Sequence, residues 1–205
     1  MYRLLACVAL SAAVVGFADP VYAVPITGGF GLSNPTTTIT FDEFGDTYLF
    51  QPITTQFSSL GVTFDAGTGG AEDWELIPDS FGLPYFSNRS IQSGAALGIM
   101  MHFNSVVSAA AFGVVSAGSP FIFEALLGGL VVDQFQMAVA QPGFIGFQNV
   151  RFDTIRITRL DPDPAQNTLA IDNLQLQAVP EPATLLLVGS GLAFAVGRRR
   201  QRKIE

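Results

Sequence analysis

The sequence has one cysteine, one histidine and one tryptophan among its 205 residues. Cys7 lies near the N-terminus, so the rest of the chain cannot form a disulfide within itself. Lys203 is the single lysine and lies near the other end. With only His102 as an ordinary base, nucleophilic or acid–base catalysis would depend on carboxylates. We therefore predict a protein without catalytic activity, and a small carboxylate-dependent glycan-cleaving enzyme remains the weaker alternative.

Positive charge is scarce in the body of the chain. Between residues 24 and 181 there are 15 acidic residues and four arginines, which leaves a net charge near −11. Such a surface repels phosphate backbones and excludes nucleic acid as an expected partner. It suits an extracellular space, divalent cations or neutral sugars.

The N-terminal 23 residues have the pattern of a secretory signal peptide. Arg3 supplies a minimal positive region, Leu4 to Val15 is an apolar region interrupted only by Ser11, and small residues follow. We expect cleavage after Ala23, with Ala18 as the alternative. A membrane helix that stays in place is disfavoured, because spanning a bilayer takes about 20 apolar residues.

The C-terminal segment, residues 179–205, has three parts. Val179, Pro180, Glu181 and Pro182 form a polar step that the prolines keep extended. Ala183 to Val196 is mostly apolar and would form a helix about 21 Å long, short for a bilayer core of about 30 Å. Arg198, Arg199 and Arg200 follow and predict a cytoplasmic C-terminus.

This three-part tail resembles the PEP-CTERM sorting signal of Gram-negative bacteria. The resemblance implies a precursor that is exported, held in the inner membrane by the short helix, and cut near the motif by the transpeptidase exosortase. The cut would leave the body at the cell surface or in the extracellular matrix, and biofilm roles follow by association. A simple tail anchor without processing is the alternative.

Residues 24–178 show no sustained helical period. Short β-prone runs alternate with clusters of Gly, Pro, Asn and Asp, which is typical of an antiparallel sheet. The sequence predicts an all-β fold, a jelly-roll-like antiparallel β-sandwich flanked by the signal peptide and a single C-terminal transmembrane helix. The predicted strands include 37–44, a strand within 51–65, 97–107, 109–115, 120–127, 130–137, 144–147, 154–158 and 168–177.

Two local features refine this prediction. Gly128-Gly129 is expected to be a hairpin turn. The apolar alternation of the last strand changes parity at Asp172-Asn173, which predicts a β-bulge there. If the first and last strands pair antiparallel, Asp42, Glu43 and Asp172 could converge.

The body also resembles calcium-binding jelly rolls, including carbohydrate-binding modules, in short motifs around Phe41-Asp42, Gly61 to Phe64 and Ile171 to Leu174. We expect one structural calcium ion on Asp42, Glu43 and Asp172, since hard oxygen ligands suit it. Ordinary solvated carboxylates at strand ends are the alternative.

The long connection Ala71–Ser90 is a second candidate surface. Trp74 and Tyr85 could stack on sugar rings while Asp73 binds hydroxyls, although these aromatic residues could instead fold the loop onto the sandwich. His102 alternates with apolar residues, which predicts a surface position. The sequence thus favours a structural or adhesion protein of the extracellular matrix, and the alternative is a module that binds exopolysaccharide.

Overall fold

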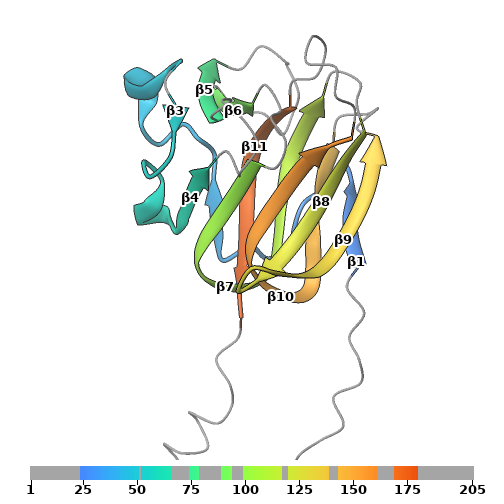
Figure 1. Ribbon diagram of the computed structural model, residues 1–205. Coiled ribbons are helices and arrows are strands. Elements are labelled where there is room, and N and C mark those ends of the chain that lie inside the picture. The colour runs from blue at the N-terminus through green and yellow to red at the C-terminus, as the bar shows by residue number, and fades with distance from the viewer. Residues whose placement is uncertain are drawn as a thin grey trace, which may run out of the picture.

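The computed structural model describes residues 24–50, 52–65, 74–78, 89–93, 99–116, 120–138, 143–160 and 169–179. These residues form 11 strands and two short 3-10 helices, η1 and η2 (Figure 1). In chain order the elements are β1 (Val24–Gly28), β2 (Thr37–Ile39), η1 (Gly45–Tyr48), β3 (Pro52–Ile53), η2 (Ser58–Leu60), β4 (Val62–Asp65), β5 (Trp74–Pro78), β6 (Arg89–Ser93), β7 (Ile99–Ser116), β8 (Pro120–Leu127), β9 (Leu130–Ala138), β10 (Gly143–Arg159) and β11 (Leu169–Ala178).

The strands form two layers that share the long strands β7 and β10. In layer A, β4 pairs with residues 100–103 of β7, which pair with the second half of β10, and β8 and β9 follow. In layer B, β1 pairs with the first half of β10, which pairs with residues 109–114 of β7, and β11 follows. Every strand pairing within these ranges is antiparallel, which confirms the predicted all-β sandwich.

Strands β7 and β10 bend where they pass from one layer to the other. The pairing of β10 with β7 shifts between Gln148 and Phe152, and Asn149 in this bend has a φ of 61°. The sequence predicted two separate strands in each of these segments. The structure joins each pair into one continuous strand, because the bend keeps its backbone paired with the neighbouring strand on both sides.

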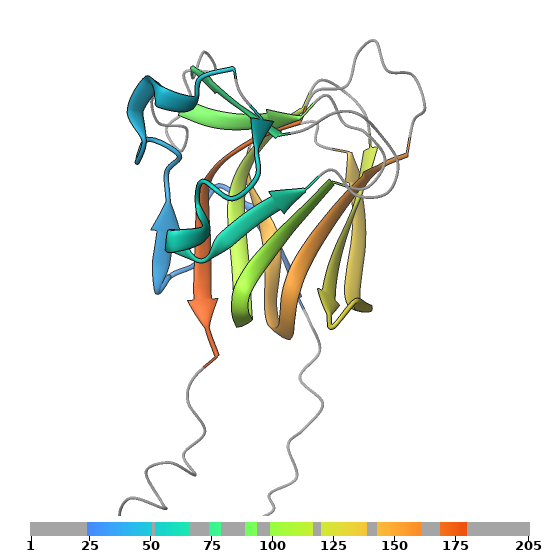
Figure 2. The ribbon, with the colours of Figure 1, turned by 60° about the vertical axis from the view of Figure 1, so that its left-hand side comes forward.

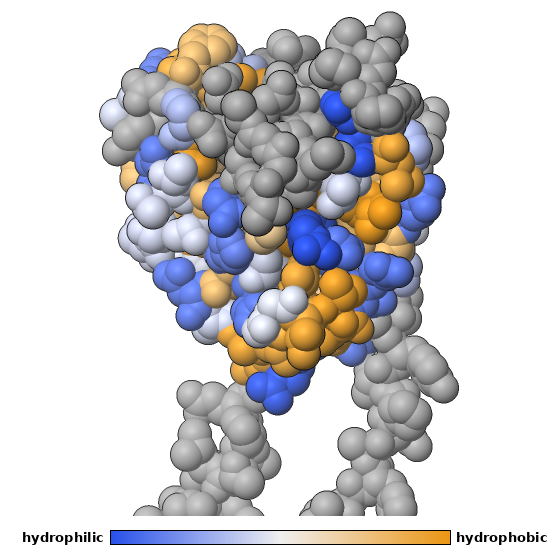
Figure 3. All heavy atoms as spheres, viewed as in Figure 1, coloured by the Kyte–Doolittle hydropathy of each residue, from blue (hydrophilic) through white to orange (hydrophobic). Residues whose placement is uncertain are grey.

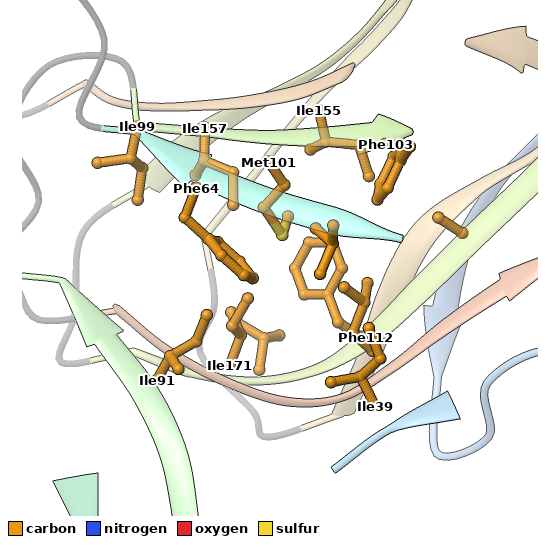
Figure 4. Close-up of a cluster of buried hydrophobic side chains, with 14 of the residues drawn as sticks. Ile39, Phe64, Ile91, Ile99, Met101, Phe103, Phe112, Ile155, Ile157 and Ile171 are labelled. Carbon is orange, nitrogen blue, oxygen red and sulfur yellow. The ribbon is translucent and has the colours of Figure 1, made fainter. Parts of the chain in front are cut away.

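The core lies between the layers and is rich in phenylalanine. Side chains from layer A, such as Met101 and Ile155, point toward side chains from layer B, such as Phe112 and Ile171 (Figure 4). Phe123 is fully buried and stacks on Phe135, with ring centroids 5.2 Å apart. In the absence of a disulfide in these residues, this packing is the main source of stability.

Several local predictions are confirmed. Gly128 and Gly129 form the β8–β9 turn with φ values of 58° and 83°, a left-handed conformation that glycine adopts readily. β2 pairs antiparallel with β11, with Ile39 opposite Leu174. The pairing of β11 with β7 shifts after Asp172, so the predicted bulge is present and places Leu174 in the core.

Other predictions were wrong in detail. β2 ends at Ile39 rather than at residue 44, because Phe41 takes a φ of 61° and the chain turns into η1. The segment predicted as a long connection, Ala71–Ser90, contains β5 and the first residues of β6, which pair as a hairpin. β1 was not predicted at all, although it pairs with β10 along its five residues.

The described chain begins and ends at the same end of the sandwich. Val24 pairs with Gln148, which pairs with Ala109, which in turn pairs with Gln177 near the end of β11. Three strand spacings of about 4.8 Å therefore separate the start of β1 from the end of β11. We call this the exit end. β3, β5 and β6 lie at the opposite end (Figure 2).

Candidate functional site

The single histidine lies on the outer face of layer A, between two hydrogen-bonding partners. Its neighbours Met101 and Phe103 are buried, so the ring of His102 faces outward, as predicted, with 39% of its side chain exposed. Its Nε2 lies 2.9 Å from Oδ2 of Asp65 on β4. Its Nδ1 lies 3.1 Å from Oγ1 of Thr154 on β10. Three adjacent strands thus hold the ring in place.

A second carboxylate extends this cluster to the β8–β9 turn. The hydroxyl of Thr154 donates to Oδ1 of Asp153 at 3.0 Å, and Oδ2 of Asp153 accepts the backbone N–H of Gly128 at 2.8 Å. Each nitrogen of the His102 ring thus has one hydrogen-bond partner, and the tautomer sets which nitrogen donates. The cluster links β4, β7, β10 and the β8–β9 turn through side-chain hydrogen bonds.

A bulge in β7 opens a hollow beside this cluster. Val107 pairs with Phe152 and His102 pairs with Thr154, so four residues of β7, 103–106, lie opposite Asp153 alone. The hollow has a volume of about 430 Å³ and is lined by residues 102–106, Asp153 and Thr154. Its carboxylate, hydroxyl, imidazole and amide groups can bind a small polar ligand or the hydroxyls of a sugar.

An ion pair continues the polar surface of layer A. Arg156 donates from Nε and Nη2 to the two carboxylate oxygens of Glu124, at 2.5 and 2.8 Å. These hydrogen bonds are the largest cause that raises the pKa of Arg156 above its ordinary value. In the described part of layer A, every aromatic ring belongs to the core or packs against it: Phe64, Phe103, Phe121, Phe123, Phe135 and Phe152. The outer face of these strands therefore offers no ring for stacking on sugars.

An arginine partners one of the carboxylates of the predicted calcium site. Nη1 of Arg89 lies 3.2 Å from Oδ1 of Asp42, and Nη2 lies 2.5 Å from Oδ1 of Asp46. The hydrogen bond to Asp46 is the largest cause that raises the pKa of Arg89. A calcium ion at Asp42 would therefore have to share this carboxylate with Arg89 or displace it.

The other two carboxylates are used locally. Glu43 accepts the backbone N–H of Thr40 at 2.8 Å, and the fully buried Asp172 accepts the backbone N–H of Asn173 at 2.5 Å. Within the described ranges, no three residues of the types His, Cys, Asp and Glu form a group that could hold a metal ion. Asp42, Glu43 and Asp172 thus do not form one in this arrangement, and calcium binding stays a prediction.

Thermal melting tests that prediction. A ligand that binds only the folded protein at a hundredfold excess over its Kd stabilises it by about 2.7 kcal/mol. For a domain of this size we expect Tm in calcium to exceed Tm in EDTA by about 5–10 °C. Glu43→Gln should reduce the difference by removing a predicted ligand, whereas Glu124→Gln, outside the predicted site, should not. Equal Tm values for the wild type in calcium and EDTA would contradict calcium binding.

The predicted sugar-binding residues are only partly described. Trp74 begins β5, where its backbone pairs with Ile53 of β3, but its side chain lies outside the described residues. Asp73 and Tyr85 lie outside them as well. The proposed role of these three residues is therefore unchanged by the structure.

The terminal signals also lie outside the described residues, apart from Val179. This applies to residues 1–23, to Pro180, Glu181 and Pro182, and to Arg198, Arg199 and Arg200. Among the residues that are described, no helix has the length and apolar character needed to cross a bilayer.

Residues 178–201 match the family model for the PEP-CTERM protein-sorting motif. The chain carries a PEP-CTERM sorting motif. The match agrees with the resemblance inferred from Val179 to Pro182, the apolar run and the arginine cluster. The PEP-CTERM motif begins at Ala178, the last residue of β11, so it follows the sandwich without an intervening linker. No curated protein matches the chain as a whole.

Solved structures with partial similarity include carbohydrate-binding modules. A family 29 module complexed with cellulohexaose is 12% identical and covers 60% of this chain and 99% of its own, with a TM-score of 0.31. A tandem of family 22 modules from Paenibacillus barcinonensis Xyn10C is 15% identical and covers 77% of this chain and 50% of its own, with a TM-score of 0.37. A cleaved adhesin domain of Lys-gingipain from Porphyromonas gingivalis is 11% identical and covers 78% and 99%, with a TM-score of 0.29. TM-scores this low do not support a conclusion about which ligands this protein binds.

The sequence analysis missed the partners of His102. Alternation along β4 and β7 indicates that Asp65 and His102 face outward. It does not reveal that β4 and β10 are the two neighbours of β7 at this point, and only that pairing brings Asp65 and Thr154 to the ring.

Proposed function

We propose that this protein is an exported, exosortase-processed structural or adhesion protein of the cell envelope or extracellular matrix, without catalytic activity. The observation that carries the proposal is the sorting motif at residues 178–201, which directly follows the last strand of a compact sandwich. A domain attached in this way is delivered as one unit outside the membrane, and a cut near Glu181 would leave the sandwich whole.

The geometry of the chain ends supports this delivery. β1 begins and β11 ends at the exit end, about three strand spacings apart. A tether that continues from β11 into the membrane therefore presents the opposite end, with β3, β5 and β6, to the exterior (Figure 1).

The His102 cluster supports a structural role for this face of the sandwich. Its hydroxyl and its two carboxylates bond to one another, to the ring or to the backbone. Together these bonds tie β4, β7 and β10 to one another and to the β8–β9 turn, which gives the four side chains a structural use.

The second candidate function is recognition of exopolysaccharide. One observation favours it: Trp74 lies on β5, at the end of the sandwich farthest from the exit end. An aromatic residue in that position could meet a polysaccharide outside the cell while the body is still tethered.

Retention on a panel of immobilised polysaccharides separates the two functions. For a structural protein, we expect the wild type and Trp74→Ala to elute together from every polysaccharide. Phe30→Ala, an exposed aromatic residue that follows β1 in layer B, serves as a control for loss of an aromatic residue elsewhere. Retention of the wild type that is lost only in Trp74→Ala would overturn the first function in favour of the second, and turnover of a labelled glycan would contradict both.

A further inference from the structure

Three consecutive exposed apolar residues begin β9. Leu130 is 74% exposed, Val131 43% and Val132 41%. An apolar patch lies at the lower end of the molecule in Figure 3, near the β8–β9 hairpin. Neighbouring exposed apolar residues indicate a contact surface more often than isolated ones do. We call Leu130, Val131 and Val132 the hairpin patch.

The hairpin patch belongs to the exit end. Ala178 pairs with Val107, and Val107 pairs with Phe152. The residue after Phe152, Asp153, accepts the backbone N–H of Gly128 in the β8–β9 turn. About three strand spacings, or some 14 Å, therefore separate the end of β11 from the turn, and both lie at the same end of the sandwich.

A short segment, residues 179–182, joins β11 to the apolar run, and its length limits how far the exit end can be from lipid. We call this segment with the apolar run the tether. Val179 is the last described residue, and the apolar run of the sorting motif begins at Ala183. Four residues span at most about 14 Å when fully extended. If the apolar run lies in the membrane, the exit end lies at the depth of the lipid headgroups or just above them.

An exposed cation lies at the same end. Of the four arginines within the described residues, Arg151 is the exposed one, and it lies in the bend of β10 between Gln148 and Phe152. A guanidinium in this position can pair with lipid phosphate oxygens. This pairing offsets part of the repulsion between the acidic body and an anionic membrane.

We propose that the hairpin patch, together with Arg151, rests on the lipid surface while the precursor is tethered. This inference depends on the membrane-held precursor of the proposed function. The patch is small, and even a single acyl chain gives only marginal membrane binding. Contact with lipid therefore depends on the tether, which holds the body at high local concentration, and is lost when the tail is cut.

Fluorescence quenching by labelled lipids tests the proposal. The full chain, with Cys7→Ser, carries one environment-sensitive fluorophore at Val131→Cys, at Gln136→Cys or at Ala193→Cys. Each version is reconstituted into two sets of vesicles of phosphatidylethanolamine and phosphatidylglycerol, one with a quencher at headgroup depth and one with a quencher in the acyl chains. Gln136 is the matched control, because it is exposed on the same strand and about 17 Å farther from the exit end.

We expect quenching by the acyl-chain quencher at position 193, quenching by the headgroup quencher at position 131, and little of either at position 136. Quenching at 193 with none at 131 would overturn the lipid contact and leave the tether intact. Absence of quenching at 193 would overturn the tether and the contact together. A blue shift at 131 without quenching would mean that a second copy of the protein covers the hairpin patch, and it would also overturn the proposal.

Discussion

Gly146→Ala is expected to destabilise the sandwich by more than about 3 kcal/mol, or to prevent folding. A methyl group at Gly146 would collide with the carbonyl oxygen of Ala110 and lie 2.7 Å from Cα of Ala111. Both atoms belong to the backbone of β7, so no side-chain rotation can relieve the contact. Urea unfolding followed by circular dichroism measures the loss as a lower midpoint at an unchanged m-value.

Gly28→Ala is the matched control. Gly28 lies on β1, which pairs with the same strand β10, but nothing lies within 4 Å of a methyl group placed there. We expect its free energy of unfolding to stay within about 0.5 kcal/mol of the wild type. Equal stabilities of Gly146→Ala and Gly28→Ala would contradict the close approach of β7 and β10 in layer B.

Replacing Pro180, Glu181 and Pro182 together by alanine is expected to stop processing of the precursor. Proline disfavours helix, so we expect Pro180 and Pro182 to stop a helix from entering Glu181, whereas alanines would allow the helix of the apolar run to continue through this position. Immunoblots of fractionated cells should then show a longer protein retained in the membrane fraction and little of the shorter form outside.

The body supplies a control for this change. Pro162, Asp163 and Pro164 form a second proline-bracketed acidic residue, remote from the apolar run. Their replacement by alanine should leave processing unchanged. Normal processing of the Pro180-Glu181-Pro182 variant would show that the motif is not what the transpeptidase recognises.

The sequence predicted the features of the fold that depend on local chemistry. Two adjacent glycines mark the β8–β9 turn because both positions need positive φ. The parity change at Asp172-Asn173 predicts a bulge, since only an inserted residue keeps Ile171 and Leu174 on the same buried face. In both cases the backbone conformation follows from a few residues that are neighbours in the sequence.

Features that depend on distant partners could not be predicted. Ser108 separates the two predicted strands 97–107 and 109–115, yet the backbone continues through it as one strand, because β10 pairs with β7 on both sides of the bend. The short strand β1 forms by pairing with the edge of β10, and nothing in its own five residues indicates that partner.

In the candidate sites, too, local features could be predicted from the sequence and contacts between distant strands could not. The outward position of His102 follows from its buried neighbours, but its bonds to Asp65 and Thr154 depend on strand order. Calcium binding at Asp42 stays a prediction, and the ion pair of Asp42 with Arg89 could not be foreseen because Arg89 lies in a hairpin that the sequence analysis took for a loop.

The intact mass of the body recovered from outside the cells tests the central claim most directly. Delivery followed by cutting predicts a polypeptide that begins near residue 24, ends near Glu181 and lacks Arg198, Arg199 and Arg200. A body that still carries the arginine cluster, or that is found only in the cytosol, would contradict the account.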